Sequence, residues 1–90
     1  MALVRDNVAA QRFEMEESGL TVFADYRRTG GRLIIDHVEA PPMLRGTGAA
    51  GRFMEALAAQ ARQSGEKIVP LCGYAAAWLN RHPEHRDLIA

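Results

Sequence analysis

A glycine-rich segment at residues 44–51 most constrains the fold of this 90-residue chain. It reads Leu-Arg-Gly-Thr-Gly-Ala-Ala-Gly and lies between an apolar run at residues 33–35 and an alanine-rich run with helical spacing. Glycine allows backbone conformations that a Cβ forbids, and the first amides of a helix have no intrahelical acceptor. A strand, a glycine loop and a helix in this order predict a cradle for a phosphate group.

Length and composition bound the class of protein. Ninety residues predict a single domain, residues 1–90, with one modest core. Lysine plus arginine and aspartate plus glutamate number 11 each, and this balance argues against a nucleic-acid partner. The lone Cys72 excludes an internal disulfide and fits a reducing cytoplasm. No apolar run approaches the roughly 20 residues that span a bilayer, so we expect a cytoplasmic protein without a membrane partner.

Hydrophobic periodicity predicts an α+β domain in the order βββαβα. Apolar side chains alternate along the first half of the chain and recur at helical spacing in much of the second half. Short turns between the first three strands predict an antiparallel meander, and a helical crossover predicts a parallel return. The expected strands span residues 8–16, 20–28, 32–38 and 68–71, and the expected helices span 48–64 and 74–80.

The glycine segment fits two phosphate-binding motifs. Residues 46–51 match G-x-G-x-x-G, the dinucleotide fingerprint. That fingerprint opens a parallel βαβ unit whose second strand ends in an acidic residue, whereas here the loop follows a meander and residues 70–72 contain no acid. The dinucleotide interpretation is therefore disfavoured.

Residues 45–50 resemble the (R/Q)-x-x-G-x-(G/A) motif of the GNAT N-acetyltransferase superfamily. Residues 68–84 are similar to the ending of its very small YjdJ-type branch, which has a P-x-C-x-(Y/F) segment after the second motif strand. The Asp36-His37 pair before the loop also resembles that branch. The likeness covers nearly the whole chain, with its motifs in the same order.

This resemblance implies a minimal GNAT-like fold, a mainly antiparallel sheet with a parallel pair splayed around the cofactor site. It implies acetyl-CoA as co-substrate, with its pyrophosphate on the loop and its pantetheine arm along the preceding strand. The implied cofactor-binding residues are Val38, Glu39, Ala40, Leu44, Arg45, Gly46, Thr47, Gly48, Ala49, Ala50 and Gly51.

Cys72 is the first candidate catalytic residue. It lies between a predicted strand and a predicted helix, where free amides and the helix dipole stabilise a thiolate. A thiolate can exchange with a thioester, but a lone cysteine also commonly packs as a small hydrophobe. Both interpretations stay open on the sequence.

His37 is the second candidate, because a neutral imidazole can accept a proton from an amine near physiological pH. Strict alternation places it on the face of Leu33 and Ile35, so a core histidine is the alternative. The same alternation points Asp36 to the other face. His82 and His85 are predicted on the solvated surface, and no spacing indicates a metal site.

Three aromatic residues and three arginines have less specific patterns. Trp78, Tyr74 and Phe53 recur at helical spacing and predict core positions. Three arginines could meet CoA phosphates, and only the first belongs to the motif; they are Arg45, Arg52 and Arg62.

Two functions fit these observations. The first is an acetyl-CoA-dependent N-acetyltransferase that acts on an amine of unknown identity, directly or by way of Cys72. The second is a non-catalytic acyl-CoA-binding or protein-interaction module with the same fold. The expected partners are acetyl-CoA and an amine, and the expected assembly is a monomer or weak homodimer.

Overall fold

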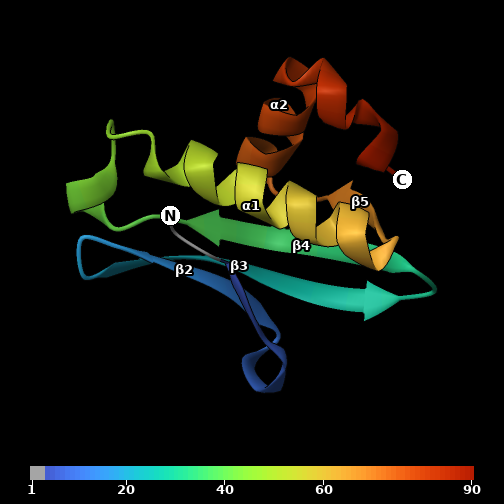
Figure 1. Ribbon diagram of the computed structural model, residues 1–90, viewed down its shortest axis with the longest axis horizontal. Helices are drawn as coiled ribbons and strands as arrows, with labels where there is room; N and C mark the ends of the chain where they lie inside the picture. The colour runs from blue at the N-terminus through green and yellow to red at the C-terminus, as the bar shows by residue number, and fades with distance from the viewer. Residues whose placement is uncertain (1–3) are drawn as a thin grey trace.

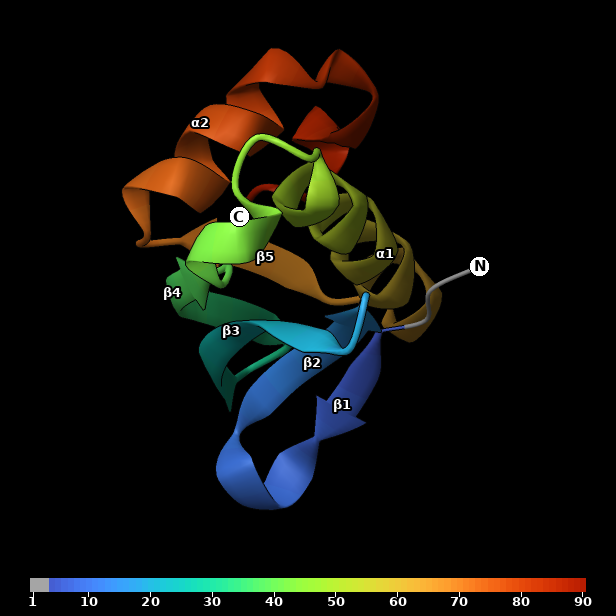
Figure 2. The same ribbon diagram turned by 90° about the vertical axis from the view of Figure 1, so that its left-hand side faces the viewer.

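A computed structural model describes residues 4–90, so the first three residues of the predicted domain lie outside the described part. One five-stranded sheet carries both α-helices on the same side (Figure 1, Figure 2). The strands are β1 (Arg5–Asn7), β2 (Arg12–Glu17), β3 (Leu20–Thr29), β4 (Arg32–Glu39) and β5 (Lys67–Pro70), and the helices are α1 (Ala49–Ser64) and α2 (Gly73–Arg81). Short 3₁₀ helices are η1 (Val8–Ala10), η2 (Pro42–Leu44) and η3 (Pro83–Leu88).

The predicted α+β class and the meander are confirmed. Strands β2, β3 and β4 pair antiparallel, and β5 returns parallel to β4 after the α1 crossover. Both tight turns have two consecutive residues with positive φ, Ser18-Gly19 and Gly30-Gly31. This conformation matches the twist of the flanking strands and fixes their register.

The predicted strand at residues 8–16 is wrong at its start. Residues 8–10 form η1, because the Asn7 side chain accepts a hydrogen bond from the Ala10 amide at 3.2 Å and Gln11 adopts a left-handed φ of 51°. The preceding residues fold back as β1, an additional edge strand beside β2. The order is therefore ββββαβα when the short 3₁₀ helices are set aside.

The core lies between the inner sheet face and α1 and α2. Alternate residues of the strands are buried, among them Phe13, Met15 and Leu33, as the period-two pattern predicted. Gly65 ends α1 with a left-handed φ of 75°, and its amide and that of Glu66 cap the last turn, as predicted. The apolar face of α1 that closes the core comprises Ala49, Phe53, Met54, Leu57, Ala58 and Ala61.

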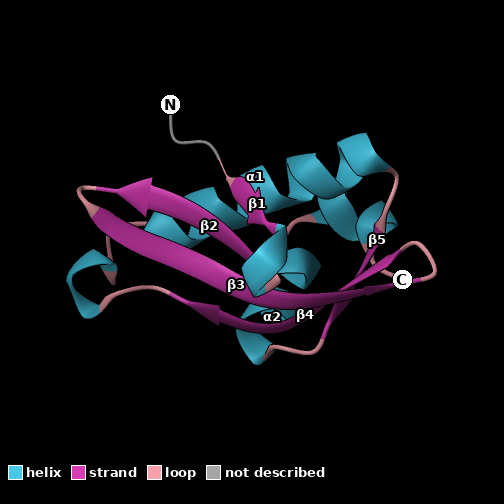
Figure 3. Ribbon diagram, turned by 90° about the horizontal axis from the view of Figure 1, so that it is seen from below, coloured by secondary structure: helices cyan, strands magenta, loops and turns pink. Residues whose placement is uncertain are grey.

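The outer sheet face carries no α-helix in the described part of the chain, and only the short η1 lies on that side (Figure 3). Half-buried Phe23, Ile34 and Val69 alternate there with charged residues. At the β5 edge, Ile89 bridges to Ile68 and the Ala90 amide donates to the Ile68 carbonyl at 2.8 Å. The domain is consequently a two-layer structure with an open sheet face.

Candidate functional site

A cavity of about 480 Å³ opens where the end of β4, the loop before α1 and the first turn of α2 meet. In Figure 2 this loop faces the start of α2 across the end of β4. The residues that line the cavity are His37, Val38, Glu39, Ala40, Leu44, Arg45, Gly46, Gly48, Ala49, Ala50, Gly51 and Tyr74. The fold thus gathers the strand and loop positions that the motif linked in sequence.

The loop leaves several backbone amides available at the head of α1. Gly46 and Gly48 have φ values of 80° and 86°, which a residue with a Cβ rarely adopts. Thr47 is used internally, since its hydroxyl donates to the Leu44 carbonyl at 2.5 Å and accepts from the Ala49 amide at 3.3 Å. Within residues 4–90, the amides with no acceptor in this segment are those of Gly46, Gly48, Ala50 and Gly51. Free amides at a helix N-terminus form an anion site.

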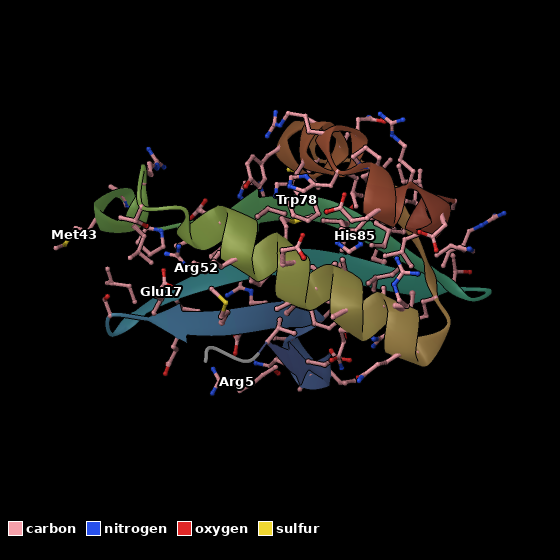
Figure 4. All side chains as sticks on the ribbon, turned by 45° about the horizontal axis from the view of Figure 1, so that its top comes forward. Arg5, Glu17, Met43, Arg52, Trp78 and His85 are labelled. Atoms are coloured by element: carbon pink, nitrogen blue, oxygen red, sulfur yellow. The ribbon has the colours of Figure 1, made fainter. Side chains whose placement is uncertain are left out.

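The arginines near this loop differ in their pairing. Arg52 donates two hydrogen bonds to Glu17 at 2.7 and 2.8 Å, and these bonds lower the pKa of the Glu17 carboxyl (Figure 4). Arg62 is similarly bound to Asp87. Both guanidinium groups are thus ion-paired, although Nη1 of Arg52 takes no part in the pair and lies beside Gly48 of the loop. Arg45 lines the cavity and has no ion-pair partner among the described side chains.

The face predicted for His37 is wrong. The pairing of β4 with β3 shifts between Ile35, opposite Tyr26, and His37, opposite Asp25, so one extra residue is inserted as a β-bulge. Ile35 is fully buried, whereas 52% of the His37 side chain is exposed. The bulge therefore turns His37 to the outer face, and a core histidine is excluded.

The same point marks the separation of the parallel pair. The register between β4 and β5 ends at Ile35 and Pro70, after which the amides of Leu71 and Cys72 both donate to the Ile35 carbonyl, at 3.0 and 3.2 Å. Bulges bend a strand, and proline offers no amide to continue the ladder. The two strands therefore part where the cavity begins.

Asp36 does not orient His37. Two hydrogen bonds from Arg27, at 2.9 and 2.7 Å, hold its carboxylate and lower its pKa. The Nε2 atom of His37 instead lies 3.1 Å from Oε1 of Glu39. The sequence pair Asp36-His37 is thus not a contact pair in the structure.

Cys72 lies at the N-cap of α2, as predicted, but outside the cavity lining within the described residues. Its carbonyl accepts the Ala76 amide at 3.0 Å, and its half-buried side chain packs against the core. Tyr74, predicted as core, is 37% exposed and lines the cavity instead. Burial of its ring raises the pKa of the Tyr74 phenol. Helical spacing could not predict that Tyr74 lines the cavity, because Tyr74 is in the first turn of α2, before the residues of that helix that pack in the core.

The two histidines that follow α2 differ from expectation, whereas two of the predicted core aromatic residues do not. Trp78 and Phe53 are core residues as predicted, with 4% and no exposure. His85, predicted on the solvated surface, has only 12% of its side chain exposed and stacks on Trp78 at 5.6 Å, while His82 stacks at 3.8 Å (Figure 4). The prediction failed because polarity along the chain does not reveal stacking between separate elements.

Three possible metal ligands meet at the same place. Donor atoms of Glu55, Glu84 and His85 lie within 4.8 Å of one another. Arg62 is close to Nδ1 of that imidazole, at 3.4 Å, and donates to the Glu84 carbonyl at 3.2 Å. The positive charge of Arg62 disfavours binding of a metal ion by these three residues. That the protein holds no metal stays a prediction.

Fold and site together define a class: an α+β domain in which free backbone amides at the N-terminus of α1 lie beside a parallel strand pair that separates after Ile35 and Pro70. Residues 12–88 match the family described as GCN5-related N-acetyl-transferase, and the chain belongs to that family of acyltransferases. The fold is similar to the solution structure of a "GCN5-like putative N-acetyltransferase" from Staphylococcus aureus, with a TM-score of 0.74 and 21% identity. The alignment covers 97% of this chain and 86% of the other. No curated protein matches the chain significantly.

None of the helices in the described part of the chain is both long and apolar enough to cross a membrane.

Proposed function

We propose that the protein transfers an acetyl group from acetyl-CoA to an amine. The observation that carries this proposal is the set of amides without acceptors at Gly46, Gly48, Ala50 and Gly51, which border a cavity of about 480 Å³. Such amides suit the CoA pyrophosphate, and Arg45 adds a positive charge at the same rim. A cavity of this volume is within the usual range for small-molecule sites.

The remaining predicted cofactor residues divide into two groups. Val38 and Glu39 on β4, and Ala40 just after it, lie beyond the last pair of β4 with β5, where backbone groups are available for the pantetheine arm. Leu44 and Ala49 give the loop an apolar base, and the Thr47 hydroxyl stabilises it through its bonds to the Leu44 carbonyl and the Ala49 amide. We propose this division of roles for the cofactor site.

We propose direct transfer, with His37 as general base. His37 belongs to the cavity lining, and its half-exposed side chain lies on the outer sheet face, from which an acceptor would approach the gap between β4 and β5, whereas Cys72 lies outside the lining. The His37 imidazole can accept the proton that the attacking amine loses. The identity of the amine, the cytoplasmic location and the monomeric or weakly dimeric state stay predictions.

Two measurements test the proposal. Calorimetric titration with CoA and acetyl-CoA measures binding, and intact-mass analysis with pools of small amines and peptides measures transfer. Acetylated amine without acetylated protein is the expected result. CoA binding with no transfer to any amine would favour the acyl-CoA-binding module, and no binding of CoA would refute both functions.

A further inference from the structure

Three carboxylates lie near the His37 imidazole, and two of them are already engaged. Asp36 is bound by Arg27 through two hydrogen bonds. Asp25, directly opposite His37 on β3, accepts a hydrogen bond from Arg12 at 3.1 Å. A carboxylate held by a guanidinium has less attraction left for a second cation.

Glu39 is the carboxylate that contacts the imidazole. Its Oε1 lies 3.1 Å from Nε2 of His37, two residues along the same strand. Beyond the bulge these side chains share the outer face, whereas Val38 between them is half-buried. Phe23, opposite Glu39, places its ring 6.3 Å from the imidazole in an edge-on arrangement. Both residues belong to the cavity lining, and the Phe23 ring lies beside the pair on the outer face.

We propose that Glu39 is the positioning residue of the transfer reaction, acting through Nε2 of His37 and leaving Nδ1 as the atom that receives the proton. This inference rests on the proposed function. When Nε2–H donates to the carboxylate, the neutral ring has its lone pair on Nδ1. The carboxylate also stabilises the imidazolium that forms during the reaction.

The step balances as follows. The amine nitrogen forms a bond to the thioester carbon, and the carbon–sulfur bond breaks with its electron pair on the CoA sulfur. The proton that the nitrogen loses goes to Nδ1 of His37, while Nε2 keeps its proton in the bond to Glu39. No oxidant, reductant or further reactant is required.

The expected effect is modest, because half of each side chain is exposed: 52% for His37 and 54% for Glu39. Exposed ion pairs are weak, and a general base contributes only a part of catalysis. We expect Glu39→Val to lower kcat about tenfold and Glu39→Gln, which keeps a hydrogen-bond acceptor, to lower it less. CoA affinity should stay unchanged, since the pantetheine arm would use the β4 backbone rather than this side chain.

The split between kcat and KM separates positioning from structure. Glu39→Val should lower kcat while the KM for acetyl-CoA stays unchanged, and Glu39→Gln, which keeps a hydrogen-bond acceptor, should restore part of the rate. Glu16→Gln is the control: it removes the same charge from an exposed position of β2 and should leave both kcat and KM unchanged.

A measurement without substrate distinguishes failure of this inference from failure of the proposed function. In ¹⁵N-labelled protein, the ring ¹⁵N chemical shifts of His37 report the contact, and we expect Glu39→Val to change the Nε2 shift and Glu16→Gln to preserve it. If Glu39→Val transfers acetyl groups as the wild type does, or loses CoA affinity instead of kcat, the positioning role is overturned. If no variant transfers acetyl groups while Glu39→Val changes the shift, the proposed function fails and takes the positioning role with it. If Glu39→Val leaves the Nε2 shift unchanged, the contact itself is refuted.

Discussion

Substitution of Ala50 by glutamate tests the anion site without disturbing the loop conformation. Ala50 is the second residue of α1 and lines the cavity, and no acidic residue occupies the first turn. A carboxylate there interacts favourably with the helix dipole, by about 0.3–1 kcal/mol, so the variant should fold with an unchanged or slightly higher melting temperature. Gly48 offers no such clean test, since its φ of 86° strains any other residue.

The same carboxylate should repel the CoA pyrophosphate. Two unit charges roughly 6 Å apart at an effective dielectric constant of about 40 repel by about 1.4 kcal/mol. Because a pyrophosphate has about two charges, the expected loss is about 2–3 kcal/mol, or a 30- to 150-fold weaker Kd. The loss should shrink as salt is raised, since the Debye length falls to ~10 Å at 0.1 M.

Isothermal titration of CoA into Ala50→Glu and wild type measures this difference. Ala59→Glu is the matched control, because it adds the same charge to an exposed position of the same helix, away from the cavity lining. The control should bind CoA like the wild type. An Ala50→Glu protein that melts normally and binds CoA with unchanged affinity would refute the assignment of the loop as the anion site.

Three further predictions concern the thiol and two ionisable groups. Cys72→Ala should retain most of the acetyl-transfer rate with CoA affinity unchanged, because Cys72 lies outside the cavity lining; a single acetyl group on wild-type Cys72 by mass spectrometry would contradict direct transfer. The Arg52 hydrogen bonds lower the pKa of Glu17, so the pair stabilises the fold above pH 4.5 and loses this effect as pH falls; Glu17→Gln should melt less pH-dependently in acid, and an identical Tm profile would speak against the pair. Burial and the bond to Asp6 raise the pKa of Tyr26 to about 12, so stability should fall as pH rises from 10 towards 12, and Tyr26→Phe should remove a phenolate absorbance step near pH 12.

The periodic parts of the fold were predictable from the sequence. Alternation along β2, β3 and the first half of β4 gave the inner face, and Gly65 gave the end of α1. These features depend on neighbours within one element, which a local pattern contains. The three-residue strand β1 was missed, because its pairing with β2 depends on a left-handed turn at Gln11.

The β-bulge in β4 explains why the alternation of apolar residues predicted the wrong face for His37. The inward residues of β4 are spaced by two between Leu33 and Ile35 and by three between Ile35 and half-buried Val38. The continuous apolar run at residues 33–35 concealed this change of phase, and strict alternation ignored it. His37 was consequently assigned to the wrong face. Its contact with Glu39 follows once the phase is corrected, since residues two apart beyond the bulge share a face.

The loop and the cavity edges depend on different kinds of information. The glycine spacing identified the segment that borders the cavity, because positive φ and free amides are local requirements. The arrangement of Cys72 and Tyr74 could not be read this way, since it depends on how the first turn of α2 packs against the end of β4. Likewise, the pairing of Arg52 with Glu17 joins residues 35 positions apart.

The number of residues in β4, as well as their side chains, determines whether β4 and β5 separate at the site. Asp36 is a single insertion, so its deletion would leave Ile35 facing inward and His37 facing outward, as they do now. A regular strand would, however, lack the bend that parts β4 from β5 after Ile35 and Pro70. A one-codon deletion would then narrow the gap on the β4 side, with Pro70 still interrupting the ladder and every residue of the glycine loop in place. Relatives that keep the glycine loop but lack this residue would be expected to have a narrower opening.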